Sequence, residues 1–88
     1  MYKAAVIGDR QSVMGFKALG LTVKYAETPQ QAADELHSLA KSGHAVIYII
    51  EQLAADIASD IAEYLDLPEV AVIPIPSKDG VLVRSGML

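Results

Sequence analysis

Four short apolar segments alternate with longer amphipathic segments along this chain. Unbroken apolar runs at residues 4–7 and 45–50 are typical of strands that are buried on both faces, as in parallel sheets. Residues 21–25 alternate apolar and polar positions, which predicts a half-exposed edge strand. Residues 70–75 read as a fourth strand. Pro74 cannot donate a ladder hydrogen bond, so this strand is predicted at the other edge.

Three helices are predicted between these strands. The first covers about residues 11–19, directs Val13, Phe16 and Leu19 at the sheet, and makes Phe16 a core residue. The third covers residues 51–65. Its predicted inner side consists of Leu53, Ile57, Ile61, Tyr64 and Leu65.

The second helix has the clearest start signal in the chain. Thr28 is placed to cap the N–H of Gln31, and the Gln31 side chain is expected to reach back to Thr28. Pro29 suits the first helical position, where its missing N–H has no helical partner to lose. The helix is predicted to run to about Ser42, with Gly43 ending it. Its predicted buried side consists of Ala32, Ala33, Leu36, Leu39 and Ala40.

This alternation of strands and helices predicts an α/β fold. We expect a four-stranded parallel sheet in the order 2-1-3-4, flanked by helices in a flavodoxin-like or receiver-like three-layer sandwich. Residues 1–76 are predicted to form one domain, followed by a loop or tail at residues 77–88. The topological switch point, where such folds bind ligands, falls beside Asp9 and Glu51.

The composition and net charge of the chain argue against several classes of function. The net charge of −4 argues against a nucleic-acid partner, which requires a concentrated basic surface. With no cysteine, the chain has neither a disulfide framework nor a thiolate metal site. The longest apolar run, residues 45–50, is far shorter than the roughly 20 residues of a membrane-spanning helix. Without a signal-peptide pattern, the chain is expected in the cytoplasm, with no direct membrane insertion.

The switch point carries two carboxylates but no phosphate-binding motif. The chain contains neither Gly-x-Gly-x-x-Gly nor a Walker A sequence, so we predict no nucleotide, no cofactor and no catalytic residues. Asp9 and Glu51 could form a divalent-ion or phosphoacceptor site, or each could cap the helix that follows; we favour capping. A phospho-receiver would have aspartate at position 51 and a second acid beside Asp9, where this chain has Arg10.

The remaining polar candidates are interpreted as surface residues. His37 and His44 have no partner at a spacing that suggests a triad or a metal site, so both are expected to be solvent-exposed bystanders. Asp56, Asp60 and Glu63 follow i, i+4, i+7 spacing and are predicted to form one stripe on the third helix. We favour a solvated face for this stripe over a docking face for a basic partner.

Four motifs in order resemble the F subunit of the V/A-type rotary ATPases. An apolar strand ends in Gly8-Asp9, and a Gly-Phe pair at residues 15–16 is followed by a helix-closing Gly20. A very apolar strand at residues 45–50 leads into a polar helix start. The last strand ends Ile-Pro-Ile-Pro-Ser at residues 73–77. The family usually continues into a C-terminal helix, which we expect this chain to lack.

The resemblance implies a non-catalytic central-stalk subunit of a proton- or sodium-translocating ATPase. Such a subunit binds the coiled-coil D subunit of the stalk and couples ATP turnover to ion transport. An apolar tail leaves the predicted edge strand, so the partner-binding residues are expected to be Ile75, Pro76, Val81, Leu82 and Val83. Simple packing of that tail along the sheet edge is the other interpretation. The alternative functions are a degenerate phospho-receiver-like signalling domain and a small ligand-binding domain at the switch point.

Overall fold

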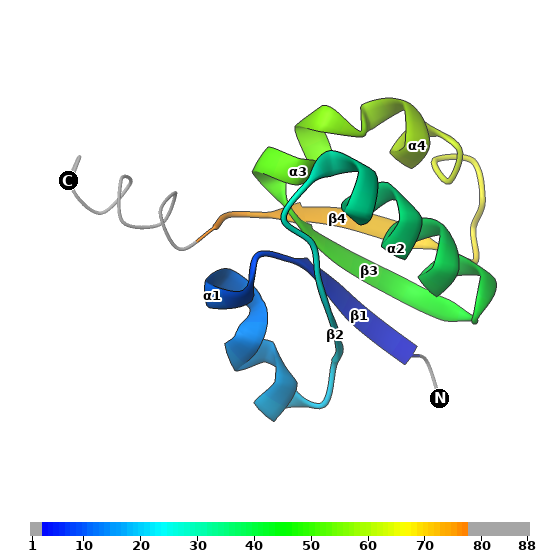
Figure 1. Cartoon of the computed structure of the whole chain (residues 1–88). Helices are drawn as coiled ribbons and strands as arrows, with labels where there is room; N and C mark the ends of the chain where they lie inside the picture. Colours follow the sequence, from blue (N-terminus) through cyan, green and yellow to red (C-terminus); the bar gives the residue numbers. More distant parts are fainter. Residues whose placement is uncertain (1–2, 78–88) are drawn as a thin grey trace, which may run out of the picture.

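Strands and helices alternate along residues 3–77, which are the residues that the structure, a computed structural model, describes (Figure 1). The strands are β1 (Lys3–Gly8), β2 (Thr22–Tyr25), β3 (His44–Ile50) and β4 (Ala71–Ile75). The α-helices are α1 (Arg10–Val13), α2 (Pro29–Lys41), α3 (Glu51–Asp56) and α4 (Ala58–Ala62), and a 3₁₀ helix, η1 (Met14–Leu19), follows α1 directly.

The four strands form one parallel sheet in the order β2-β1-β3-β4. This confirms the predicted fold class and both predicted edge strands. The two most apolar strands, β1 and β3, lie at the centre and pair with each other from Ala4 opposite Val46 to Ile7 opposite Ile49. Pro74 lies in the edge strand β4, opposite Ile49, where its missing N–H removes no hydrogen bond to a further strand.

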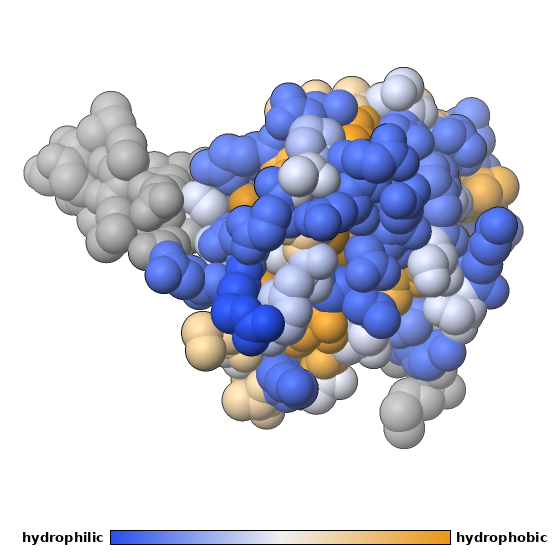
Figure 2. Space-filling model, in the orientation of Figure 1, coloured by the Kyte–Doolittle hydropathy of each residue, from blue (hydrophilic) through white to orange (hydrophobic). Residues whose placement is uncertain are grey.

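Helices cover the two faces of the sheet unequally. Helices α2, α3 and α4 lie on one face and α1 lies on the other (Figure 1). The side visible in Figure 2 is mainly hydrophilic, with hydrophobic atoms showing between the elements. The larger core, under α2 and α3, contains Ala5, Ile7, Ala26, Ala32, Ala33, Leu36, Leu39, Ile47, Ile49, Ala54 and Ile57. The smaller core, under α1, contains Val6, Val13 and Ile50.

Helix α2 begins and ends largely as predicted. The Gln31 N–H donates to the Thr28 hydroxyl at 3.2 Å, and Gly43 follows the helix with φ at 86°. One detail was wrong, because the Gln31 side chain accepts a hydrogen bond from the Glu27 N–H at 2.8 Å and not from Thr28. Leu36 is fully buried, which contributes about 1.5–3 kcal/mol.

The first predicted helix is shorter and tighter than expected. It has four α-helical residues before it becomes the 3₁₀ helix η1, which Gly20 closes with φ at 85°. Exposure rises along the predicted apolar side, from fully buried Val13 through half-buried Phe16 to Leu19, which is 72% exposed. The helix therefore leaves the sheet toward its C-terminal end. The prediction of Leu19 as inward-facing was wrong, and Phe16 packs against the smaller core without being fully enclosed.

The predicted third helix is two helices. The break falls at Ile57, where φ is −124° and ψ is 34°, and the Ile57 side chain is buried in the larger core. The break changes the direction in which later residues point, since α4 restarts with its own phase. Leu65, predicted on the inner side, is 75% exposed, whereas Ile61 and Tyr64 pack against the core as expected.

Candidate functional site

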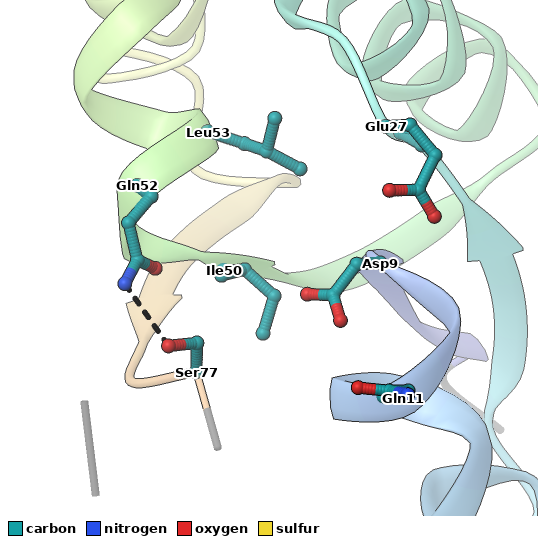
Figure 3. A pocket seen from close by; sticks show the side chains of 8 residues that line it. Asp9, Gln11, Glu27, Ile50, Gln52, Leu53 and Ser77 are labelled. Carbon is teal, nitrogen blue, oxygen red and sulfur yellow. Dashed lines mark hydrogen bonds between the residues drawn. The ribbon is translucent and has the colours of Figure 1, made fainter. Parts of the chain in front are cut away.

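A cavity of about 280 Å³ lies at the carboxyl ends of the strands, at the predicted switch point. Figure 3 shows the Asp9 and Glu27 carboxylates on one wall and Gln52 with Ser77 on the other. The Gln52 amide donates a hydrogen bond to the Ser77 hydroxyl at 2.9 Å, which joins the start of α3 to the residue two positions after β4. The lining residues are Asp9, Gln11, Ala26, Glu27, Ile50, Gln52, Leu53 and Ser77.

Asp9 caps α1, as predicted. The Ser12 N–H donates to the Asp9 Oδ2 atom at 3.1 Å, which satisfies one of the backbone donors that a helix N-terminus leaves unpaired. Next to it, the Arg10 guanidinium lies 4.3 Å from the centre of the Tyr25 ring, in a cation–π contact between α1 and β2. Asp9 and Arg10 therefore hold the turn that follows β1 against the edge of the sheet.

Glu51 is not the N-cap of α3, but it lies in the first turn of that helix, where the prediction expected negative charge to be favourable. Ile50 occupies the N-cap position of α3, and Glu51 is already the first helical residue. Gln52, not Glu51, lines the cavity, and the second carboxylate beside Asp9 is Glu27. Glu27 was not predicted as a residue of this site. It follows β2 by two residues, and β2 was predicted to pair with the first strand, so its position near Asp9 could have been expected.

The described lining of this cavity is negatively charged. Among residues 3–77, its lining includes two carboxylates and two side-chain amides but neither lysine nor arginine. The carboxylates of Asp9 and Glu27 on one wall repel an incoming anion. A bare phosphate group would therefore be repelled at this wall unless a bound cation offset the charge.

Neither histidine is the exposed bystander that the sequence predicted. His44 is only 6% exposed, and its ring contacts the Thr22 hydroxyl at 3.1 Å and the Leu39 carbonyl at 3.2 Å. His37 lies half-buried between α2 and α4, with Nε2 at 2.9 Å from the Asp60 carboxylate and Nδ1 at 2.5 Å from the Tyr64 hydroxyl. Both histidines have polar partners that lie far from them in sequence.

The acidic stripe also does not exist as predicted. Asp56 ends α3, whereas Asp60 belongs to α4 and Glu63 is its C-cap, so the break at Ile57 separates the first acid from the other two. Asp60 points at His37 and is not purely solvated. Burial, followed by the charges of Glu63 and Asp60, raises the pKa of the Tyr64 hydroxyl above its usual value.

An open apolar face is the second candidate site. We use the name "open sheet face" for the residues of β3 and β4 that point to the same side as α1 and are exposed or half-buried. In-register pairs place Val46 beside Ala71 and Tyr48 beside Ile73. Ile73 is 41% exposed, and Ala71 is exposed as well. The members of the open sheet face are Val46, Tyr48, Ala71, Ile73 and Ile75.

This open sheet face includes part of the predicted partner-binding set. Ile75 is half-buried at the end of β4 and packs against the smaller core, and Pro76 follows it, also half-buried. Beside the start of β3 and β4, a hollow of about 610 Å³ continues the surface. The other predicted residues, Val81, Leu82 and Val83, lie outside the described residues.

Comparison with known sequences assigns the chain to a protein family. A sequence profile of the ATP synthase (F/14-kDa) subunit matches residues 4–87. The chain belongs to this family. Its relatives include the F subunit of a V-type ATP synthase from Fusobacterium nucleatum, 44% identical over 82 residues that cover 93% of this chain and 78% of the relative. The F subunit of an A-type ATP synthase from Methanothermobacter thermautotrophicus is 32% identical over 78 residues, covering 86% and 74% of the two chains.

Membership of the F/14-kDa family confirms the resemblance found in the sequence. It also makes the chain part of an ATP synthase complex, so its function is exerted within a larger assembly. None of the helices within residues 3–77 has the length and apolarity that crossing a bilayer requires. A subunit of such a complex contacts other subunits, and the open sheet face is one surface available for such a contact.

Proposed function

We propose that this chain is a non-catalytic rotor subunit of a V/A-type ATP synthase and binds the coiled-coil D subunit of the stalk. Through that contact it takes part in coupling ATP turnover to the transport of protons or sodium ions. The complex would hold the chain at the cytoplasmic side of the membrane. The family match and the names of the relatives, which are F subunits of V-type and A-type ATP synthases, support this proposal.

The open sheet face carries the proposal. It joins an edge strand to the half-exposed side of a central strand, and its exposed members are apolar. A flat apolar strip of this kind suits the side of a long helix or coiled coil, which can lay its own apolar positions along it. A stable contact buries about 1,000 Å² or more, and a few apolar residues near its centre dominate the binding energy. Ile73 is placed to be such a residue.

The charge distribution supports the non-catalytic part of the proposal. The cavity at the switch point presents Asp9 and Glu27 to any ligand that enters, and triphosphates are repelled by that pair. Within the described part of the chain, the cavity lining offers no cation to offset the repulsion. We propose that the chain contributes binding and mechanical coupling, while nucleotide chemistry occurs elsewhere in the complex.

The test is binding of purified full-length chain to the coiled-coil stalk subunit of the same organism. Ile73→Asp places a charge in the open sheet face and is expected to weaken binding about 100-fold, or about 2.7 kcal/mol. Leu65→Asp is the matched control, because Leu65 is 75% exposed and follows α4, which covers the other face of the sheet. It should bind like wild type. Calorimetry and co-elution measure both.

Two outcomes would contradict the proposal. If the wild-type chain does not bind the coiled-coil stalk protein at all, the rotor role is wrong. If Ile73→Asp binds as tightly as Leu65→Asp, the open sheet face is not the docking surface. The double variant Val81→Asp, Val83→Asp then tests the predicted tail separately, since those residues are part of the sequence-based prediction.

A further inference from the structure

Helices α2 and α4 meet at a cluster of metal-ligating side chains on the layer opposite the open sheet face. His37 comes from α2, Asp60 from α4, and Glu63 from the C-cap of α4. Each of these residues offers one ligand atom, and the three atoms lie within 4.8 Å of one another. The closest pair, His37 Nε2 and Asp60 Oδ1, is 2.9 Å apart.

We propose that His37, Asp60 and Glu63 form a binding site for a divalent transition-metal ion, with Zn²⁺ the ion that the ligands suit best. Zn²⁺ binds imidazole nitrogen at about 2.0–2.1 Å and carboxylate oxygen at about 2.0–2.2 Å in a tetrahedron. Ligand atoms in such a tetrahedron lie about 3.3–3.5 Å apart. The distances in the cluster, from 2.9 Å to no more than 4.8 Å, bracket this separation, so small side-chain rotations would suffice.

The hydrogen bond at the other ring nitrogen of His37, Nδ1, is also typical of a metal-binding histidine. His37 Nδ1 lies 2.5 Å from the Tyr64 hydroxyl, and the two rings are 5.6 Å apart between centres. When Nδ1–H donates to Tyr64, the lone pair of the imidazole is on Nε2, which lies beside the Asp60 carboxylate. Metal-ligating histidines usually have such a second partner, which sets the tautomer and the orientation of the ring. Tyr64 is therefore a positioning residue for the site.

A simple His37–Asp60 hydrogen bond explains only part of this arrangement. It does not require Glu63, which the i, i+3 spacing places on the same side of α4 as Asp60. Glu63 is exposed, and its carboxylate makes no hydrogen bond or ion pair with the other described residues. Two neighbouring carboxylates repel each other, and a divalent cation removes that repulsion. The imidazole favours Zn²⁺ over Mg²⁺ or Ca²⁺, which prefer oxygen ligands only.

The ion would tie together two helices on either side of the helix break. Asp60 and Glu63 follow the irregular residue Ile57, whereas His37 belongs to the longest regular helix. A shared ion would therefore clamp α4 onto α2. The fourth ligand would be water, because the three side chains leave the outer side of the cluster open to solvent.

The test is calorimetric titration of the untagged full-length chain with Zn²⁺ alone. One equivalent is expected to bind. His37→Gln should weaken binding by about 100-fold or more, Glu63→Gln by at least about 10-fold, and Tyr64→Phe by about 10-fold through loss of ring positioning. Asp56→Asn, which changes an exposed acid of α3 outside the cluster, is the matched control and should leave the affinity unchanged.

A spectroscopic measurement on the wild-type chain separates the site from effects on folding. In ¹⁵N NMR of the imidazoles, Zn²⁺ should shift the His37 Nε2 resonance and leave Nδ1 protonated. Mg²⁺ at the same concentration should do neither. The proposal is overturned if Zn²⁺ does not bind at about 1 mM, if the His37 Nε2 resonance stays unchanged, or if folded His37→Gln binds as tightly as Asp56→Asn.

Discussion

Gly8 fills a position in which the structure leaves no room for a side chain. It ends β1, where the smaller core closes over it. A methyl group on its Cα would overlap the Ile50 Cγ1 atom and would lie 2.8 Å from the Val13 Cγ1 atom. Both neighbours are buried, so neither side chain can turn outward to make room. Gly8→Ala should therefore force β1, β3 and α1 apart.

The expected magnitude follows from two opposing terms. Overpacking a buried site by one methyl group costs about 1–3 kcal/mol. Replacing glycine by alanine also restricts the unfolded chain, which stabilises the fold by about 0.4–1 kcal/mol where the residue fits. Because the added methyl group overlaps one buried side chain and crowds a second, the overpacking cost should lie near the upper end of its range, which leaves a net loss of about 2 kcal/mol, or roughly 8–16 °C in Tm for a domain of this size. Gly15→Ala is the matched control, since no atom lies within 4 Å of its added methyl group.

Urea unfolding followed by circular dichroism measures both variants under the same conditions. Gly15→Ala should be as stable as wild type or slightly more so, because only the unfolded-state effect operates there. The reasoning fails if Gly8→Ala lies within about 0.5 kcal/mol of wild type, the range of ordinary surface substitutions. It also fails if Gly15→Ala is destabilised as strongly as Gly8→Ala, because the two positions would then not differ in packing.

Two further predictions concern α2 and Tyr64. Thr28→Ala removes the hydroxyl that accepts from the Gln31 N–H and should lower the free energy of unfolding by about 1 kcal/mol, whereas Thr28→Ser should retain most of it, as urea midpoints would show. Burial and the nearby acids raise the Tyr64 pKa above 10.0, so the unfolded phenol loses its proton first. The contribution of Tyr64 to the free energy of unfolding should thus be fully present below pH 10, and it should be lost as the pH rises through the folded pKa. Tyr64→Phe should reduce the fall of the urea midpoint as the pH rises above about 10, and an equal slope in both proteins would contradict this.

Local signals in the sequence determined the order of the elements and the ends of α2. Unbroken apolar runs occur where strands are buried on both faces, and the alternation with helices requires parallel pairing and right-handed crossovers. The Asp9 and Thr28 caps are also local, since each side chain bonds a backbone N–H three residues away. Such contacts depend on few degrees of freedom, so residue type and spacing were sufficient to predict them.

The candidate site could be predicted only in part. The sequence indicated Asp9 at the switch point and Ile75 with Pro76 at the edge strand. It assigned Glu51 to the switch-point cavity, which Glu27 lines instead. Glu51 is the first residue of α3, as predicted, but Gln52 beside it lines the cavity, and successive side chains point about 100° apart around a helix axis. Glu27 follows β2, whose pairing with β1 brings its carboxylate to the wall that Asp9 lines (Figure 3).

Only the tertiary structure decided the contacts between residues distant in sequence. His37 meets Asp60 and Tyr64 from 23 and 27 residues away, which no local spacing encodes. The burial of Ile57 accompanies a break in a helix whose pattern looked continuous, and that break exposes Leu65 and separates Asp56 from Asp60. Hydrophobic periodicity records which side of an element is apolar. How far that side is covered depends on the neighbouring elements, and their placement is settled only when the whole chain packs.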